Sequence, residues 1–138
     1  MSLAYNKAKG AEFETDLVDY LRERFPAFAP DIRRSRLSGR NDQGDIHAKL
    51  PLPVRKIHGG TRNHQIAQTR YVIIEAKHVK DFELAEFIKE VTVEVENWTR
   101  AVKPADPATG IVVIKRRNRS IGQSYVVQTL DSFLGLFQ

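Results

Sequence analysis

The sequence predicts an α/β protein in which one central mixed β-sheet is flanked by helices. Apolar residues recur at helical spacing in 7–25 and in 82–102. Apolar runs rich in β-branched residues occupy 71–77, 111–114 and 125–128. Segments that alternate in this way pack as helices on the faces of a sheet. The 138 residues suffice for one hydrophobic core, so a single domain over 1–138 is expected.

The N-terminal half predicts one helix followed by strands. The helical pattern of 7–25 stops at Pro26, because proline cannot continue a helix. The segment 32–37 is a candidate strand, although it is rich in arginine. Turn-forming residues then lead to Gly44, and a short strand is expected to begin at Asp45.

The segment 49–70 is a basic insertion with Gly59 and Gly60 near its centre, and either an extended hairpin or a mobile loop fits it. The strand 71–77 follows, then a long helix over 82–102. Two further strands and a short terminal helix, capped by Thr129 or Asp131, complete the chain. The expected order is α-β-β-β-α-β-β-α.

Composition excludes several classes of protein. The chain has no cysteine, which rules out disulfides and thiolate metal sites and leaves carboxylates and histidines as metal ligands. No apolar run is long enough to cross a bilayer, so no membrane association is expected. The first residues lack the apolar core of a secretory signal, and a cytoplasmic location is expected.

The net charge of +5 is concentrated in three basic clusters. Each cluster alone is typical of a solvated loop, but the three together favour contact with a phosphate backbone. The expected nucleic-acid-binding residues are Arg33, Arg34, Arg36, Ser38, Arg40, Arg55, Lys56, Arg62, Lys115, Arg116 and Arg117.

The candidate catalytic residues are Asp45, Glu75 and Lys77. Alternate residues of a strand share a face, so Glu75 and Lys77 project together from the end of an apolar strand. Asp45 can approach Glu75 if the two strands pair as a hairpin. Two close carboxylates favour a cation between them, and Mg²⁺ prefers such oxygen ligands. A metal and a lysine are the parts needed to hydrolyse a phosphodiester.

The order of these motifs resembles the PD-(D/E)XK nuclease superfamily, and most narrowly the Holliday junction resolvase-like endonucleases of bacteriophages. The resemblance lies in Lys9-Gly10-Ala11-Glu12 on the first helix, Gly44-Asp45-Ile46, Glu75-Ala76-Lys77-His78, and Gly110 to Arg117. It spans nearly the whole chain. It implies a restriction-endonuclease-like core and, for a viral protein, a location in the host cytoplasm.

The resemblance also implies a role for each residue. Asp45, Glu75 and the backbone carbonyl of Ala76 would hold Mg²⁺, with Mn²⁺ as a substitute, and Lys77 would be the catalytic lysine. Glu12 would add a further acid from the first helix. Ser38 would belong to a loop near the cleaved strand. The implied protein is a homodimeric endonuclease acting on branched DNA, with Holliday junctions as the preferred substrate.

Two alternatives stay open. A nuclease of the same superfamily could act on duplex, flap or single-stranded DNA with unchanged chemistry. A non-catalytic nucleic-acid-binding module would use the basic clusters and keep the carboxylates for structure, since an isolated Glu-x-Lys is more often a surface ion pair. Trp98 is expected in the core or at a dimer interface. The acids at four-residue spacing on the long helix, Glu86, Glu90 and Glu94, are expected to form a solvated face.

Overall fold

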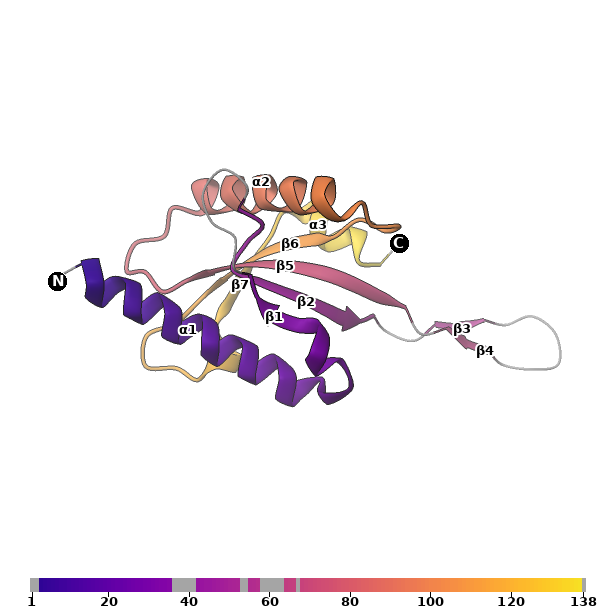
Figure 1. The fold of residues 1–138 in the computed structure, drawn as a ribbon, viewed down its shortest axis with the longest axis horizontal. Coiled ribbons are helices and arrows are strands. Elements are labelled where there is room, and N and C mark those ends of the chain that lie inside the picture. Colours follow the sequence, from indigo (N-terminus) through magenta and orange to yellow (C-terminus); the bar gives the residue numbers. More distant parts are fainter. Residues whose placement is uncertain (1–2, 36–41, 53–54, 58–63, 67, 138) are drawn as a thin grey trace.

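The computed structural model describes residues 3–35, 42–52, 55–57, 64–66 and 68–137 (Figure 1). Within these residues the helices are α1 (Leu3–Arg24), α2 (Leu84–Val102) and α3 (Leu130–Gly135), with short 3-10 turns at η1 (Pro26–Asp31) and η3 (Ile121–Gln123). The main sheet contains β1 (Ile32–Arg34), β2 (Ile46–Pro51), β5 (Thr69–Lys77), β6 (Thr109–Ile114) and β7 (Tyr125–Val127). The predicted α/β class with a mixed central sheet is confirmed.

The five strands lie in the order β1-β2-β5-β6-β7. β5 and β6 are parallel because α2 connects them, and the other neighbouring pairs are antiparallel. In the pairing of β2 with β5, Ile46 lies opposite Ile74. The start of β2 therefore meets the end of β5, as the expected approach of Asp45 to Glu75 requires.

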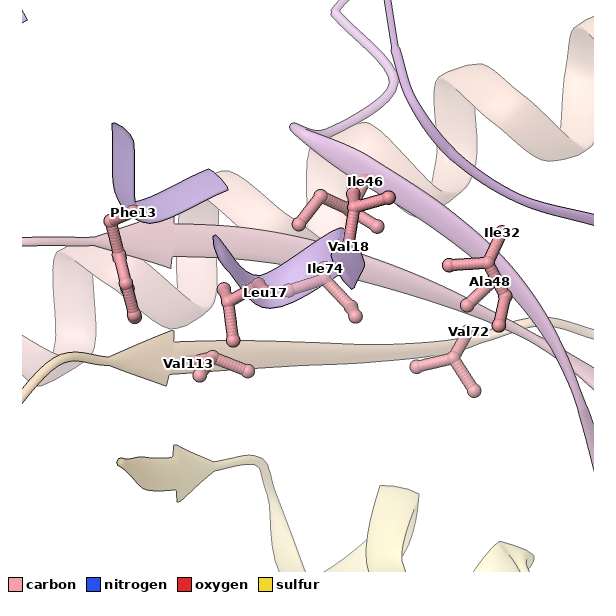
Figure 2. Close-up of a cluster of buried hydrophobic side chains, with 9 residues drawn as sticks. All are labelled: Phe13, Leu17, Val18, Ile32, Ile46, Ala48, Val72, Ile74 and Val113. Carbon is pink, nitrogen blue, oxygen red and sulfur yellow. The ribbon is translucent and has the colours of Figure 1, made fainter. Parts of the chain in front are cut away.

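The two long helices cover opposite faces of this sheet (Figure 1). Figure 2 shows the core under α1, where Phe13, Leu17 and Val18 pack against Ile46 and Ile74. On the other face, the core cluster combines two residues of α2 with two of β6: Phe87, Val91, Val112 and Ile114. Because neighbouring residues of a strand face opposite sides, the α1 side receives Ile74 and Ala76, while Glu75 and Lys77 turn towards α2.

The basic segment contains β3 (Arg55–Ile57) and β4 (His64–Ile66), which pair as a separate antiparallel two-stranded sheet. Figure 1 shows this pair projecting from the end of the main sheet where β2 finishes and β5 begins. That end is opposite the one that carries Asp45 and Lys77.

Several predicted boundaries shift by a few residues. α1 begins at Leu3 rather than at residue 7, and β1 is described only as far as Arg34. Thr129 is the residue that caps α3, since its Oγ1 accepts a hydrogen bond of 3.1 Å from the N–H of Ser132. Among the described helices, none has the length and apolar character needed to span a membrane.

Candidate functional site

A tight turn before β2 positions Asp45. Gly44 has a φ of +92°, a conformation that favours glycine, and its N–H donates to Asp42 Oδ1 at 2.9 Å. The side chains of Asn97 and His47 donate to the carbonyl oxygens of Asp42 and Gln43, at 2.8 and 2.7 Å. This network fixes the backbone immediately before Asp45 from both α2 and β2.

Asp45 is joined to the end of β5 by two hydrogen bonds. Its N–H donates to the carbonyl oxygen of Ile74 at 2.9 Å, and its Oδ2 accepts from the N–H of Ala76 at 2.8 Å. The carboxyl group of Asp45 therefore lies beside Glu75. For Ala76, the contact described is through its N–H, whereas the predicted metal ligand is its carbonyl oxygen.

Lys77 lies between two carboxylates. Its Nζ is 3.3 Å from Glu75 Oε1 and 2.7 Å from Glu90 Oε2, and it stands 4.9 Å from the centre of the Phe87 ring. Burial opposes the charged form, but the hydrogen bond to Glu90 and the charge of Glu75 outweigh it and raise the pKa of Lys77. The ammonium group is therefore charged and held in place at neutral pH.

Glu94 is the largest departure from the sequence prediction. It was expected on a solvated face, yet only 5% of the residue is exposed, and it contacts Glu75. The reason is its position on α2, since Phe87, Val91, Glu94 and Trp98 follow the three- and four-residue steps of the buried stripe. That spacing was the available signal for a buried glutamate.

The acid that α1 supplies to Asp45 is Glu14, a residue that the sequence analysis did not select. Glu14 is hydrogen-bonded to Asp45 and forms a 3.1 Å ion pair with Arg34. Glu12, the predicted acid, is exposed and contributes negative charge near His78. Glu14 lies four residues before the buried Val18, on the side of α1 that faces the sheet, which is the signal that separates it from Glu12.

Burial and mutual repulsion raise the pKa of the clustered carboxyl groups. Burial and the charge of Asp45 raise the pKa of Glu14 to about 7, and burial raises that of Asp45 itself. Burial raises the pKa of Glu75 to about 7, against the effect of its hydrogen bond with Glu94. Burial and the neighbouring Glu75 raise the pKa of Glu94 to about 10. Without a cation, the cluster therefore retains protons near neutral pH.

The donor set suits a hard divalent cation. Glu75, Glu90 and Glu94 each offer a carboxylate oxygen, and these atoms lie within 4.8 Å of one another. Oε2 of Glu75 and Oε2 of Glu94 are buried and have no hydrogen-bond donor within the described part of the chain. Two ionised carboxylates in contact need either a shared proton or a cation between them. Oxygen ligands of this kind are those that Mg²⁺ and Mn²⁺ prefer.

The predicted nucleic-acid-binding residues fall at different places. Lys115, Arg116 and Arg117 line a groove beside His78, whereas Arg33 and Arg34 line a second groove against α1. Arg55 and Lys56 belong to β3, at the far end of the main sheet (Figure 1). Arg36, Ser38, Arg40 and Arg62 lie outside the described residues.

Comparison with protein-family models, with curated proteins and with solved structures finds no match to this chain.

Proposed function

We propose that this protein is a metal-dependent DNA endonuclease with a restriction-endonuclease-like core of the PD-(D/E)XK type. The observation that carries the proposal is the cluster of Glu14, Asp45, Glu75 and Glu94 beside Lys77. Glu75 and Glu94 are buried and Glu14 and Asp45 are partly buried. A purely structural role for four such neighbouring acids is costly, because each ionised carboxylate destabilises the ionised form of the next. Such an arrangement is typical of functional sites.

Asp45 and Glu75 are the proposed principal metal ligands. Glu90 and Glu94, whose carboxylate oxygens lie within 4.8 Å of those of Glu75, adjoin them on one side, and Glu14 adjoins Asp45 on the other. A bound Mg²⁺ or Mn²⁺ would supply charge neutralisation at the phosphoryl group and acidify a water molecule. Lys77 supplies a fixed positive charge for the charge that develops during phosphodiester hydrolysis. Glu90 orients this lysine through its 2.7 Å contact. The hydrogen bond from Ala76 orients Asp45.

The proposed substrate is DNA, and branched DNA such as a Holliday junction is the preferred form. The basic groove that contains Arg116 and Arg117 adjoins the end of β5 and supports contact with phosphates. Cutting two opposed strands of a junction calls for two active sites, which a symmetric homodimer provides.

The surface formed by β7 and α3 is the proposed homodimer interface. β7 is an edge strand of the main sheet, and α3, which follows it in the chain, exposes Leu130 and Phe133, 70% and 45% accessible. A second copy would cover this edge and the apolar side chains together. Sedimentation of wild type and of Leu130→Glu tests the interface: we expect a dimer and a monomer, and a monomeric wild type would overturn the proposal.

The test of the catalytic proposal is cleavage of a labelled four-way junction and of a matched duplex in Mg²⁺, Mn²⁺ or EDTA. Wild type should cut only with metal, and Asp45→Asn and Lys77→Ala should each lose at least about a hundredfold in rate. Glu23→Gln, at an exposed acid near the far end of α1, is the matched control. Binding without cleavage under every metal would favour a non-catalytic module. Equal cutting of the junction and the duplex would support a nuclease but contradict a preference for Holliday junctions.

A further inference from the structure

A broad groove opens at the end of the main sheet where β5 and β6 finish, next to Lys77. Its volume is about 790 Å³, and it is bordered by α1, by the connection from β5 to α2 and by the connection from β6 to β7. Figure 1 shows these segments at the same end of the molecule. The carbonyl oxygen of Lys77 accepts a hydrogen bond from the N–H of Lys115. The groove therefore begins one residue beyond the proposed catalytic lysine.

The charged side chains that line this groove are basic. Among the residues that the structure describes, its lining contains no acid, and its cations are Lys9, Lys80, Lys115, Arg116, Arg117 and Arg119. Such a concentration of positive charge next to an acidic cluster favours a polyanion whose phosphate lies between the two.

Two aromatic side chains interrupt the basic lining. Phe82 and Tyr125 are 45% and 46% exposed, and their ring centres are 6.2 Å apart at an interplanar angle of 81°. The guanidinium of Arg116 lies 4.8 Å from the centre of the Tyr125 ring. Exposed rings that adjoin a planar cation are a surface on which flat, uncharged groups stack.

We infer that the groove binds unpaired nucleotides of a DNA strand next to the scissile phosphate, with bases stacked on Phe82 and Tyr125. The inference rests on the proposed nuclease function and narrows its substrate class. Phosphates alone would explain the lysines and arginines, but they would leave the two rings exposed to water. Bases inside a duplex cannot reach these rings, whereas unpaired bases present their faces. The groove thus favours DNA in which pairing is lost beside the cut.

The test is binding of fluorescein-labelled dT12 and of a 12-base-pair duplex, measured by anisotropy in EDTA. Phe82→Leu and Tyr125→Leu keep apolar bulk but remove the ring. Each should weaken dT12 binding about tenfold and change duplex binding by less than about twofold. Phe82 lies outside the helices and strands, so Phe82→Leu tests the ring even if Tyr125→Leu disturbs β7.

A charge-matched pair of variants isolates the groove from general electrostatics. Arg116→Ala/Arg117→Ala should weaken binding of both DNAs and lower the salt dependence, whereas Arg24→Ala/Lys89→Ala loses the same charge elsewhere and should leave binding unchanged. Equal weakening by both double variants would overturn the assignment of the groove.

Unchanged dT12 binding in both leucine variants would also overturn the inference. If these variants change the oligomeric state as well, the rings belong to a protein interface. Because binding is measured without metal, its result is independent of cleavage. If the wild type binds dT12 through the groove but never cuts DNA, the proposed nuclease function is wrong and the proposed nucleotide binding by the groove still holds.

Discussion

The buried carboxyl group of Glu94 on α2 contacts that of Glu75 on β5, so the long helix and the central strand meet through two acids. The charges of Asp42 and Asp45 lie near this contact and disfavour ionised Glu94. Without metal, a proton on Glu94 allows the two carboxyl groups to hydrogen-bond. A bound cation can replace that proton. Removing only the acidity of Glu94 separates the two roles.

Glu94→Gln should leave the stability of the metal-free protein at pH 7 nearly unchanged, within about 1 kcal/mol. The pKa of Glu94 is raised to about 10, so the side chain is already neutral at pH 7 and an amide replaces it closely. Affinity for Mn²⁺ should fall by about tenfold to a hundredfold, since a metal requires the carboxylate. Calorimetric titration and urea unfolding measure the two effects. Glu96→Gln, two residues along on the exposed side, is the control; equal metal affinity in both variants would contradict the prediction.

Asp45→Asn should lower the cleavage rate at least about a hundredfold and raise the stability of the metal-free protein at pH 8 by about 1 kcal/mol. The amide oxygen can still accept the hydrogen bond from Ala76, while the repulsion among Asp45, Glu14 and Glu75 is reduced. Urea unfolding in EDTA measures the change. A variant less stable than wild type would show that Asp45 stabilises the fold rather than straining it.

Metal-free stability should fall as pH rises from about 4.5 to about 7. The pKa values of Glu14 and Glu75 are raised from 4.5 to about 7 on folding, so the native state binds more protons than the unfolded chain in this range. Divalent metal removes the penalty for the ionised form. The increase in melting temperature produced by Mg²⁺ or Mn²⁺ should therefore be larger at pH 8 than at pH 5.5, and scanning calorimetry at the two pH values checks this. An equal shift at both would contradict a carboxylate site.

Gly44→Ala should cost about 1–3 kcal/mol of stability and reduce cleavage. A Cβ at this position would lie 2.7 Å from Cγ2 of Ile73, and its φ of +92° disfavours any side chain. Relief of the clash would move Asp45. Gly10→Ala is the matched control, because no described atom lies within 4 Å of its added Cβ and alanine favours a helix. Thermal unfolding should show a lower melting temperature for the first variant and an equal or higher one for the second.

Much of the fold followed from local pattern. Apolar residues at helical spacing predicted α1 and α2, and three apolar runs predicted β5, β6 and β7. These patterns are local, because the spacing of apolar residues depends only on which face each element buries. The approach of Asp45 to Glu75 was conditional on the pairing of their strands, and the register shows that β2 and β5 pair. The basic segment was left open between a hairpin and a loop, since neither its glycines nor its charges select one.

The site was less predictable, because its acids come from four elements. Asp45, Glu75 and Lys77 stood out by their position at strand ends. Glu14 and Glu94 resemble ordinary helix glutamates until their helices are docked. Each occupies a position on the buried side of its helix, and a carboxyl group at such a position signals a partner from another element. Both residues would have been selected if charged residues at the three- and four-residue spacing of the apolar stripe had also been predicted to face the sheet.

The acids of the site are far apart in the sequence, and this affects when the site can form during synthesis on the ribosome. Its acids extend from α1 to α2, and the last of them, Glu94, is held by a helix that ends at Val102. A nascent chain that has exposed only α1, β2 and β5 possesses Asp45, Glu75 and Lys77 but not the helix that encloses them. The polypeptide therefore completes this cluster only after α2 has left the ribosome.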